Sequence, residues 1–222
     1  MTAGSITLDG PRLSPASGGR ARSLVVLLHG YGSNGDDLIS LAPLVQPLLP
    51  DAAFVAPNAP SRIPNMAEAY QWWPIRSFSM EERSAGAIAA APAIDAFLTE
   101  ELARLGLDDD RLLLIGFSQG TMMALHVGLR RKMSVAGIIG YSGMLVAADR
   151  LAGEIRSRPP TLLVHGTADD VVPFGSLAEA ERELKGVGVD VETHVSPGVG
   201  HTVGPDGLAA GGAFARRILA AM

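Results

Sequence analysis

The chain has 222 residues, of which 47% are hydrophobic and 18% are charged, so it can bury a substantial core and intrinsic disorder is excluded. The net charge of −5 comes without a basic stripe, which argues against nucleic acid as a partner, and no apolar run is long enough to span a membrane. The absence of cysteine excludes disulfides, thiolate metal sites and a cysteine nucleophile.

The sequence shows no targeting signal and no domain boundary. Residues 1–20 contain neither a basic start nor an apolar stretch, so no signal peptide is predicted and a cytoplasmic location is expected. No shift in composition marks a linker, and there is no internal repeat. We therefore expect one domain over residues 1–222.

Predicted strands and helices alternate along the chain. In order, they are strand 24–28, helix 36–48, strand 52–55, helix 81–105, strand 111–115, a helix from about residue 119, strand 135–141, strand 161–164, helix 174–187, strand 189–195 and helix 205–222. Residues 5–8 are a candidate edge strand, Pro43 interrupts the first helix, and Pro92 should kink or divide the second. The pattern predicts an α/β fold with a mainly parallel central sheet, right-handed crossovers and helices on both faces.

The segment 116–120, Gly-Phe-Ser-Gln-Gly, stands between the apolar run 112–115 and a predicted helix. A serine between two glycines at a strand-to-helix turn is the pattern of a nucleophile elbow. Such a turn is sharp, so the nucleophile adopts strained backbone angles and its neighbours must be small. The pattern favours Ser118 as a nucleophile, while an ordinary strand-to-helix turn is the alternative interpretation.

Polar loops also follow other predicted strands, and the carboxyl ends of parallel strands meet at one edge of a sheet. These loops are His-Gly-Tyr-Gly at 29–32, His-Gly-Thr-Ala-Asp-Asp at 165–170 and Gly-Val-Gly-His at 198–201. Together with Ser118 they supply a serine, an acid and a histidine in the chain order of an α/β-hydrolase triad. In such a triad the imidazole accepts the serine proton and a buried carboxylate orients the imidazole.

Each of the five histidines is a candidate base. We select His201 because it follows a strand in a glycine-rich loop and precedes the last helix. His194 lies within a strand pattern, and His165 at a strand end favours a bond to the backbone of a neighbouring loop. His29 should shape the first loop, and His126, within a helix, is expected to be structural or exposed.

The acid and the oxyanion donors come from the same loops. Asp169 is preferred to Asp170, for which a cap or a surface charge is the plainer interpretation. The N–H of Gln119, just past the nucleophile, can stabilise an oxyanion, and a second donor should come from the loop around Tyr31. No histidine pair has metal-ligand spacing with a third ligand nearby, and no glycine-rich stretch fits a phosphate or dinucleotide motif.

Four segments together resemble the carboxylesterase/phospholipase family of serine hydrolases, which includes the acyl-protein thioesterases. They are Leu-His-Gly-Tyr-Gly-Ser at 28–33, Gly-Phe-Ser-Gln-Gly at 116–120, His-Gly-x-x-Asp-x-x-Val-Pro at 165–173 and Gly-His at 200–201. The resemblance implies an α/β-hydrolase fold with Ser118, Asp169 and His201 as the catalytic triad. It also implies that the backbone N–H groups of Tyr31 and Gln119 form the oxyanion hole.

The expected substrate pocket is apolar and open. Its predicted side chains are Trp73, Ile75, Met144, Leu145 and Val172. Of the adjacent Trp72 and Trp73, one should lie in the core and the other at the pocket, and Met144 and Leu145 are alternatively a hydrophobic patch under a loop. Residues 66–78 look more like the bacterial carboxylesterase branch than like the long apolar loop of many acyl-protein thioesterases. The connection 141–160 is too short for a sizeable cap domain.

The sequence therefore predicts a serine carboxylesterase, with no metal and no cofactor, that hydrolyses small to medium carboxylic esters through an acyl-serine intermediate. An acyl-protein thioesterase or a lysophospholipase on the same machinery is the alternative, followed by a non-catalytic binding protein with a hydrolase fold. The expected partner is a small-molecule ester, without nucleic acid or a membrane span, and a homodimer is a further expectation.

Overall fold

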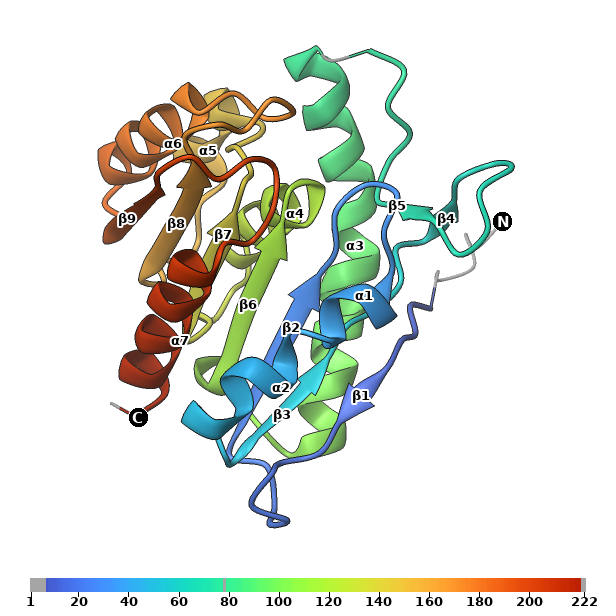
Figure 1. Cartoon of the computed structure of the whole chain (residues 1–222), viewed down its shortest axis with the longest axis vertical. Coiled ribbons are helices and arrows are strands. Elements are labelled where there is room, and N and C mark those ends of the chain that lie inside the picture. Colours follow the sequence, from blue (N-terminus) through green and yellow to red (C-terminus); the bar gives the residue numbers. More distant parts are fainter. Residues whose placement is uncertain (1–6, 78, 221–222) are drawn as a thin grey trace.

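The computed structural model describes residues 7–77 and 79–220, and a seven-stranded sheet runs through the described chain (Figure 1). In spatial order the strands are β1 (Arg12–Leu13), β3 (Ala52–Val55), β2 (Ser23–Leu28), β6 (Leu112–Phe117), β7 (Gly137–Tyr141), β8 (Thr161–Gly166) and β9 (Val191–Ser196). Only the pair β1–β3 of this sheet is antiparallel; the other neighbours are parallel. A separate hairpin joins β4 (Ser61–Arg62) to β5 (Tyr70–Gln71).

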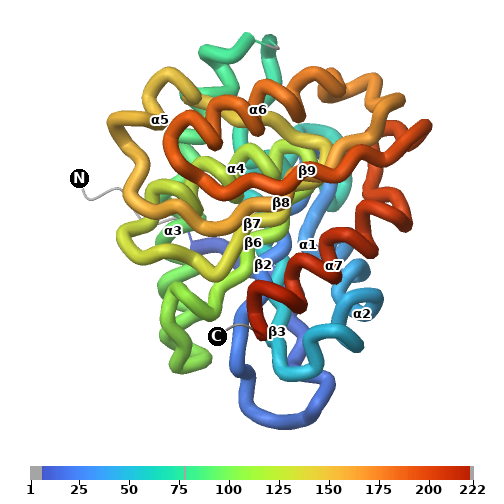
Figure 2. Tube along the Cα trace, turned by 90° about the vertical axis from the view of Figure 1, so that its left-hand side faces the viewer, coloured from blue at the N-terminus to red at the C-terminus, as the bar shows by residue number. Residues whose placement is uncertain are grey.

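Helices cover both faces of the sheet (Figure 2). One face carries α3 (Met80–Leu105), α4 (Gln119–Gly128), α5 (Ala148–Glu154) and α6 (Gly175–Gly186). The other carries α1 (Gly35–Ile39), α2 (Ala42–Val45) and α7 (Pro205–Ala220), and short 3₁₀ turns η1 (Gln46–Leu48) and η2 (Asp109–Arg111) complete the helical elements of the described chain. The predicted fold class is confirmed.

Strand β2 shows why the sheet needs cover on both sides. All of its residues are buried: Leu24, Val26 and Leu28 belong to the core under α3 and α4, whereas Val25 and Leu27 belong to the core under α1 and α7. A parallel strand that is buried on both faces requires a continuous apolar run, which is the pattern seen in the sequence.

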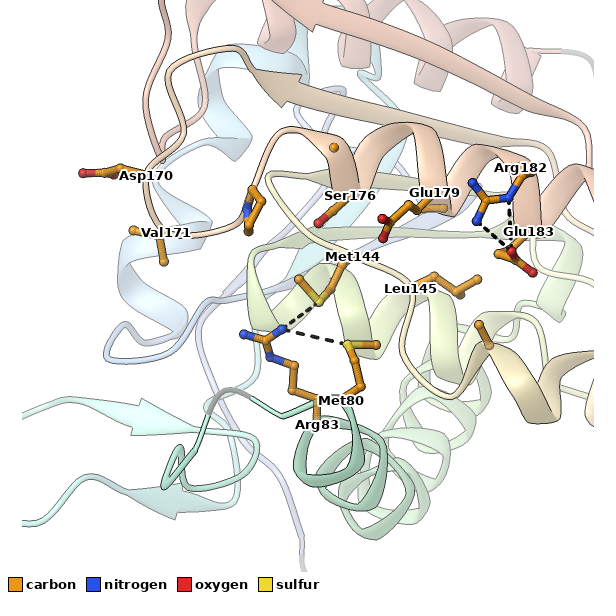
Figure 3. A pocket seen from close by; sticks show the side chains of 14 residues that line it. Met80, Arg83, Met144, Leu145, Asp170, Val171, Ser176, Glu179, Arg182 and Glu183 are labelled. Carbon is orange, nitrogen blue, oxygen red and sulfur yellow. Dashed lines mark hydrogen bonds and ion pairs between the residues drawn. The ribbon is translucent and has the colours of Figure 1, made fainter.

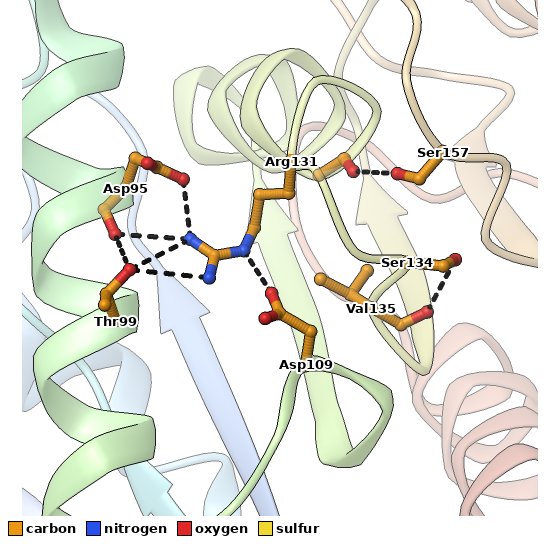
Figure 4. Close-up of polar contacts among 8 residues, drawn as sticks. Asp95, Thr99, Asp109, Arg131, Ser134, Val135 and Ser157 are labelled. Atoms are coloured by element: carbon orange, nitrogen blue, oxygen red, sulfur yellow. Dashed lines mark hydrogen bonds and ion pairs between the residues drawn. The ribbon is translucent and has the colours of Figure 1, made fainter.

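A buried arginine ties the end of α4 to α3 and η2 (Figure 4). The Arg131 side chain is 8% exposed, and its Nη1 lies 2.6 Å from Asp95 Oδ1 on α3. Its Nε donates to Asp109 Oδ1 on η2. The guanidinium therefore joins the segment after α4 to α3 and η2.

Three expectations from the sequence need correction. The candidate edge strand 5–8 lies partly outside the described residues, and the described Leu8 is not in a strand; the edge strand is Arg12–Leu13, which is too short to show an alternating pattern. The predicted helix 36–48 is three short pieces, since Pro43 stands in the first turn of α2 instead of interrupting one helix. Helix α3 runs undivided through Pro92, because apolar residues on both sides of the proline pack on the core.

Candidate active site

Ser118 stands at the turn between β6 and α4. Its backbone angles, φ 54° and ψ −117°, are strained for a residue with a side chain. A Cβ on Gly116 would lie 2.4 Å from the carbonyl oxygen of Gly120, and a Cβ on Gly120 would lie 1.9 Å from that of Leu28. Both glycines are therefore required by close approach of strand, turn and helix, as the elbow pattern predicts.

Three loops bring Ser118, His201 and Asp169 together. The Ser118 Oγ lies 3.0 Å from His201 Nε2, and His201 Nδ1 lies 2.8 Å from Asp169 Oδ2. The Asp169 side chain is fully buried and the His201 side chain is 17% exposed. Because the carboxylate only accepts hydrogen bonds, Nδ1 carries the ring proton and Nε2 is free to accept the serine hydroxyl proton. Phe117 lies against the His201 ring, with centroids 4.9 Å apart.

The carboxylate of Asp169 is held by its own turn. Its Oδ1 accepts from the backbone N–H of Val171 at 3.0 Å and of Val172 at 2.8 Å. Burial by itself raises the pKa of Asp169, but the hydrogen bonds from His201, Val172 and Val171 outweigh it, so the pKa lies below its usual range. Asp170 is exposed, as a surface charge would be.

The other histidines have partners of different kinds. His29 Nε2 accepts from the N–H of Ala59 at 3.0 Å, so its Nδ1 carries the proton and donates to the carbonyl of Gly30 at 2.7 Å. Burial lowers the pKa of His29, which keeps the ring neutral. His194, by contrast, lies 2.9 Å from Asp206 Oδ2 and is 32% exposed, and this contact lowers the pKa of Asp206 to about 2.

His126 and His165 are both buried. Burial first, and then the nearby Arg130, lower the pKa of His126 to about 4. His165 Nε2 lies 3.0 Å from the carbonyl oxygen of Val172, which is the backbone contact expected of it, and also 3.3 Å from Asp169 Oδ2.

The two N–H groups expected to bind an oxyanion flank Ser118. Gln119 is the first residue of α4, so its N–H has no partner within the helix. In the loop after β2, the N–H of Gly32 donates to the carbonyl of Tyr70 and that of Ser33 to the carbonyl of Gly30. Within the described chain the N–H of Tyr31, between them, has no protein acceptor, so it can donate to a ligand.

The side chain of Gln119 has a role that sequence reasoning missed. Its Oε1 accepts from the backbone N–H of Trp72 at 2.9 Å, and its Nε2 donates to the carbonyl of Trp73 at 3.0 Å. The indole of Trp72 donates in turn to the carbonyl of His29 at 2.9 Å. Gln119 therefore couples the oxyanion loop to the Trp72–Trp73 segment. The glutamine in Gly-Phe-Ser-Gln-Gly was the available signal.

A pocket of about 740 Å³ opens between the start of α3, the loop after β7 and the start of α6 (Figure 3). Met144 and Leu145 line it, as do Val171 and Pro173 from the turn beside Asp169. Neither Ser118 nor His201 lines it. The pocket is less apolar than expected, because charged side chains share its walls: Arg83, Asp170, Glu179, Arg182 and Glu183.

Three of the predicted substrate-binding residues lie elsewhere. Trp72 is 3% and Trp73 5% exposed, so both indoles are buried instead of one facing each way. Trp73 packs against α3, where a Cβ on Gly86 would lie 2.2 Å from the indole. Val172 is buried and Ile75 is exposed, and neither lines the pocket.

Residues 15–217 match the sequence family described as phospholipase/carboxylesterase. The chain belongs to this family. Acyl-protein thioesterase 1 of Schizosaccharomyces pombe is 33% identical over 157 residues, 67% of this chain and 69% of the relative. A probable carboxylesterase of Oryza sativa subsp. japonica is 29% identical over 89% of this chain and 78% of its own length. The crystal structure of esterase PE8 has a TM-score of 0.92 at 46% identity, covering 96% of this chain and all of the other.

This phospholipase/carboxylesterase family member is thus a hydrolase of the esterase and acyl-protein thioesterase type, and the family and the α/β-hydrolase fold expected from the sequence are confirmed. Over residues 7–77 and 79–220, no group of three or more His, Asp or Glu side chains is placed to hold a metal ion. In the same residues, no helix combines the length and apolar character that a membrane crossing needs.

Proposed function

We propose that this chain is a serine carboxylesterase that cleaves small to medium carboxylic esters through an acyl intermediate on Ser118. The observation that carries the proposal is the unbroken line of contacts from Ser118 Oγ through His201 to Asp169, at 3.0 and 2.8 Å. The first distance lets His201 Nε2 take the serine proton, and the second lets Asp169 hold the imidazole in the orientation that this transfer needs.

In the proposed reaction, Ser118 Oγ attacks the ester carbonyl carbon while its proton passes to His201 Nε2. The carbonyl π electrons move onto the oxygen, and the backbone N–H groups of Tyr31 and Gln119 donate to that oxyanion. The intermediate then expels the alcohol, which takes the proton from His201, and leaves an acyl-Ser118 ester. Water, deprotonated by His201, attacks this ester and releases the acid, so serine and imidazole are restored.

Asp169 supports both halves of this cycle. Its buried carboxylate holds the Nδ1–H tautomer and stabilises the imidazolium that forms when Nε2 takes a proton. Its lowered pKa keeps the carboxylate ionised to a lower pH than an ordinary aspartic acid. The acid therefore remains charged over the whole range in which an esterase of this kind is assayed.

The pocket lies beside the proposed nucleophile, because a Cβ on Gly143, directly before the lining residue Met144, would lie 3.1 Å from the carbonyl oxygen of Ser118. We take it as the acyl site, and it then supports a preference for small to medium acyl groups. Met144 and Leu145 offer apolar contact, but Arg83 lies within the same pocket, with its Nη1 3.2 Å from Met144 Sδ. Each buried methylene contributes about 0.8 kcal/mol only while it finds apolar protein to contact. We therefore expect kcat/KM to rise from acetate to butyrate or hexanoate and then to fall.

A second candidate function is thioester or lysophospholipid hydrolysis by the same residues. It is favoured by the names of several relatives, which are acyl-protein thioesterases, and by a pocket large enough for a longer chain. The single domain, a homodimer and a cytoplasmic location are predictions that stand beside either function.

A panel of p-nitrophenyl esters from acetate to palmitate, with palmitoyl thioester and lysophosphatidylcholine added, tests the proposal. Leu145→Ala should move the chain-length optimum, while Val146→Ala, next to it and also buried but outside the pocket, should not. A profile still climbing at palmitate, or a thioester preferred to every oxoester, would favour the second candidate. Full activity in Ser118→Ala would refute both.

A further inference from the structure

His165 makes a contact that the proposed mechanism does not use. It is the penultimate residue of β8, and its side chain is 1% exposed, so it reaches neither solvent nor a substrate. Its Nε2 lies 3.0 Å from the carbonyl oxygen of Val172 and 3.3 Å from Asp169 Oδ2. Both neighbours are acceptors, because a carbonyl cannot donate and the Asp169 carboxyl is ionised. The ring nitrogen between them must therefore carry a proton.

The Nε2–H of His165 contacts the turn 169–172, which carries the proposed catalytic acid. Within the turn, Asp169 Oδ1 accepts from the N–H groups of Val171 and Val172, which fixes one carboxylate oxygen. The other oxygen, Oδ2, faces His201 Nδ1 at 2.8 Å and His165 Nε2 at 3.3 Å. His165 Nε2 donates to the carbonyl of Val172 at one end of the turn and lies beside Asp169 Oδ2 at the other, so it links β8 to both ends of the turn.

We propose that His165 is a positioning residue that holds the Asp169 carboxylate in the orientation that meets His201. This inference rests on the proposed function, because it gives His165 no contact with substrate and lets it act only through the acid. The His165 ring is buried and fixed by β8, so it loses little conformational freedom when it contacts the carboxylate. It can therefore orient Asp169 Oδ2, and it does not compete with His201 for the serine proton. Phe174, whose ring meets the imidazole edge to face with centroids 6.1 Å apart, restrains it further.

The tautomer of His165 in the unaltered protein is the first test, and it needs neither substrate nor variant. Nitrogen-15 NMR of histidine-labelled protein should show that Nε2 of His165 carries a proton. A ring protonated only on Nδ1 would overturn the proposal, because no donor would then face Asp169.

The second test compares His165→Leu, which removes the donor at similar volume, with His165→Gln, which can return an amide N–H to the same place. The readout is the downfield proton resonance of His201 Nδ1–H, which reports its hydrogen bond to Asp169. In His165→Leu this resonance should broaden or disappear, and kcat should fall by about 10- to 100-fold with little change in KM. His165→Gln should recover most of both.

The matched control is His194→Leu, which removes the exposed histidine paired with Asp206 and should change neither readout. A folded His165→Leu variant with the wild-type resonance and wild-type kcat would overturn the proposal. If His165→Leu does not fold, two readouts decide the proposal. They are the tautomer of His165 in the unaltered protein and the His201 Nδ1–H resonance in His165→Gln. Failure of the proposed function would show as activity retained in Ser118→Ala, whereas the resonance would still report whether His165 orients Asp169.

Discussion

At the scale of single residues, neighbours in the sequence have different roles because their side chains point into different surroundings. Asp169 is buried in a turn that supplies two backbone donors, whereas Asp170 is exposed and lines the open pocket. The chain itself therefore offers a matched pair of acids for testing the proposed triad.

We predict that Asp169→Asn lowers kcat by about 10³- to 10⁴-fold, because the amide favours the wrong tautomer of His201 and cannot stabilise the imidazolium. Asp170→Asn should keep kcat within about threefold of the wild type, because Asp170 lines the pocket but is not part of the hydrogen bonds that join Ser118, His201 and Asp169. Steady-state kinetics on p-nitrophenyl butyrate, with thermal unfolding as a folding control, makes the comparison. Equal losses in the two variants would contradict the assignment of the acid.

His126 should make the protein less stable in mild acid. Its pKa falls from 6.5 in the unfolded chain to about 4 in the fold, so between these values the unfolded chain binds the proton and the folded chain does not. Stability is therefore fully present above pH 6.5 and decreases as the pH falls towards 4.

The free energy of unfolding of the wild type should decrease between pH 7 and pH 5. We predict that this decrease is about 1–2 kcal/mol smaller in His126→Leu. Urea unfolding at both pH values measures the difference. The control is Leu44→Ala, which removes an exposed side chain with no titratable group and should leave the pH dependence close to that of the wild type. If the free energy of unfolding changes with pH in His126→Leu as it does in the wild type, burial of this ring does not oppose its protonation.

At the scale of elements, the elbow depends on how closely α4 approaches β2. We predict that Gly120→Ala costs several kcal/mol or prevents folding, because its Cβ would lie 1.9 Å from the carbonyl oxygen of Leu28. Gly186→Ala, at the end of α6 with nothing within 4 Å of its Cβ, should be neutral or stabilise by up to about 1 kcal/mol. Chemical denaturation compares the two, and equal stability would contradict the close packing of the elbow.

Substitution of Arg131, which links the segment after α4 to α3 and η2, gives a second test of how the elements are held together. Arg131→Met should destabilise the protein by about 3 kcal/mol, because it leaves the Asp109 carboxylate, 18% exposed, without its partner. Adding Asp109→Asn should recover part of the loss, since the unpaired charge is then gone. A double variant no more stable than the single one would mean that the arginine acts through packing alone.

The long elements could be predicted from the sequence because each depends on a local pattern. The buried run of β2 and the Gly-x-Ser-x-Gly turn are of this kind, and the catalytic loops follow from their positions after strands. The short pieces could not be predicted, since β1 exists only through pairing with β3, and α5 covers about two turns of a connection without periodicity.

The pocket was the least predictable part of the site. Trp73 is buried under α3 and Val172 turns inward, while Val171 and Pro173 beside it face the cavity. Which of two adjacent residues faces a cavity depends on the turn that carries them and on contacts with distant helices. The bonds from Gln119 to the Trp72–Trp73 backbone likewise join residues more than forty positions apart.

At the scale of the whole molecule, the fold collects chemistry from distant parts of the chain. The parallel sheet ends its strands at one edge, so the loops after β6, β8 and β9 bring Ser118, Asp169 and His201 into one line of hydrogen bonds, and the loop after β2 carries the proposed oxyanion donor. The proposed function requires that this edge makes Ser118 a nucleophile.

Labelling with a fluorophosphonate probe tests that claim most directly, because the probe reacts with an activated serine whatever the natural ester is. We predict one adduct per chain, mapped by peptide mass spectrometry to Ser118, with none in Ser118→Ala and slow labelling in His201→Ala. Asp170→Asn should label at the wild-type rate. An adduct on another residue, or equal labelling in Ser118→Ala, would contradict the account.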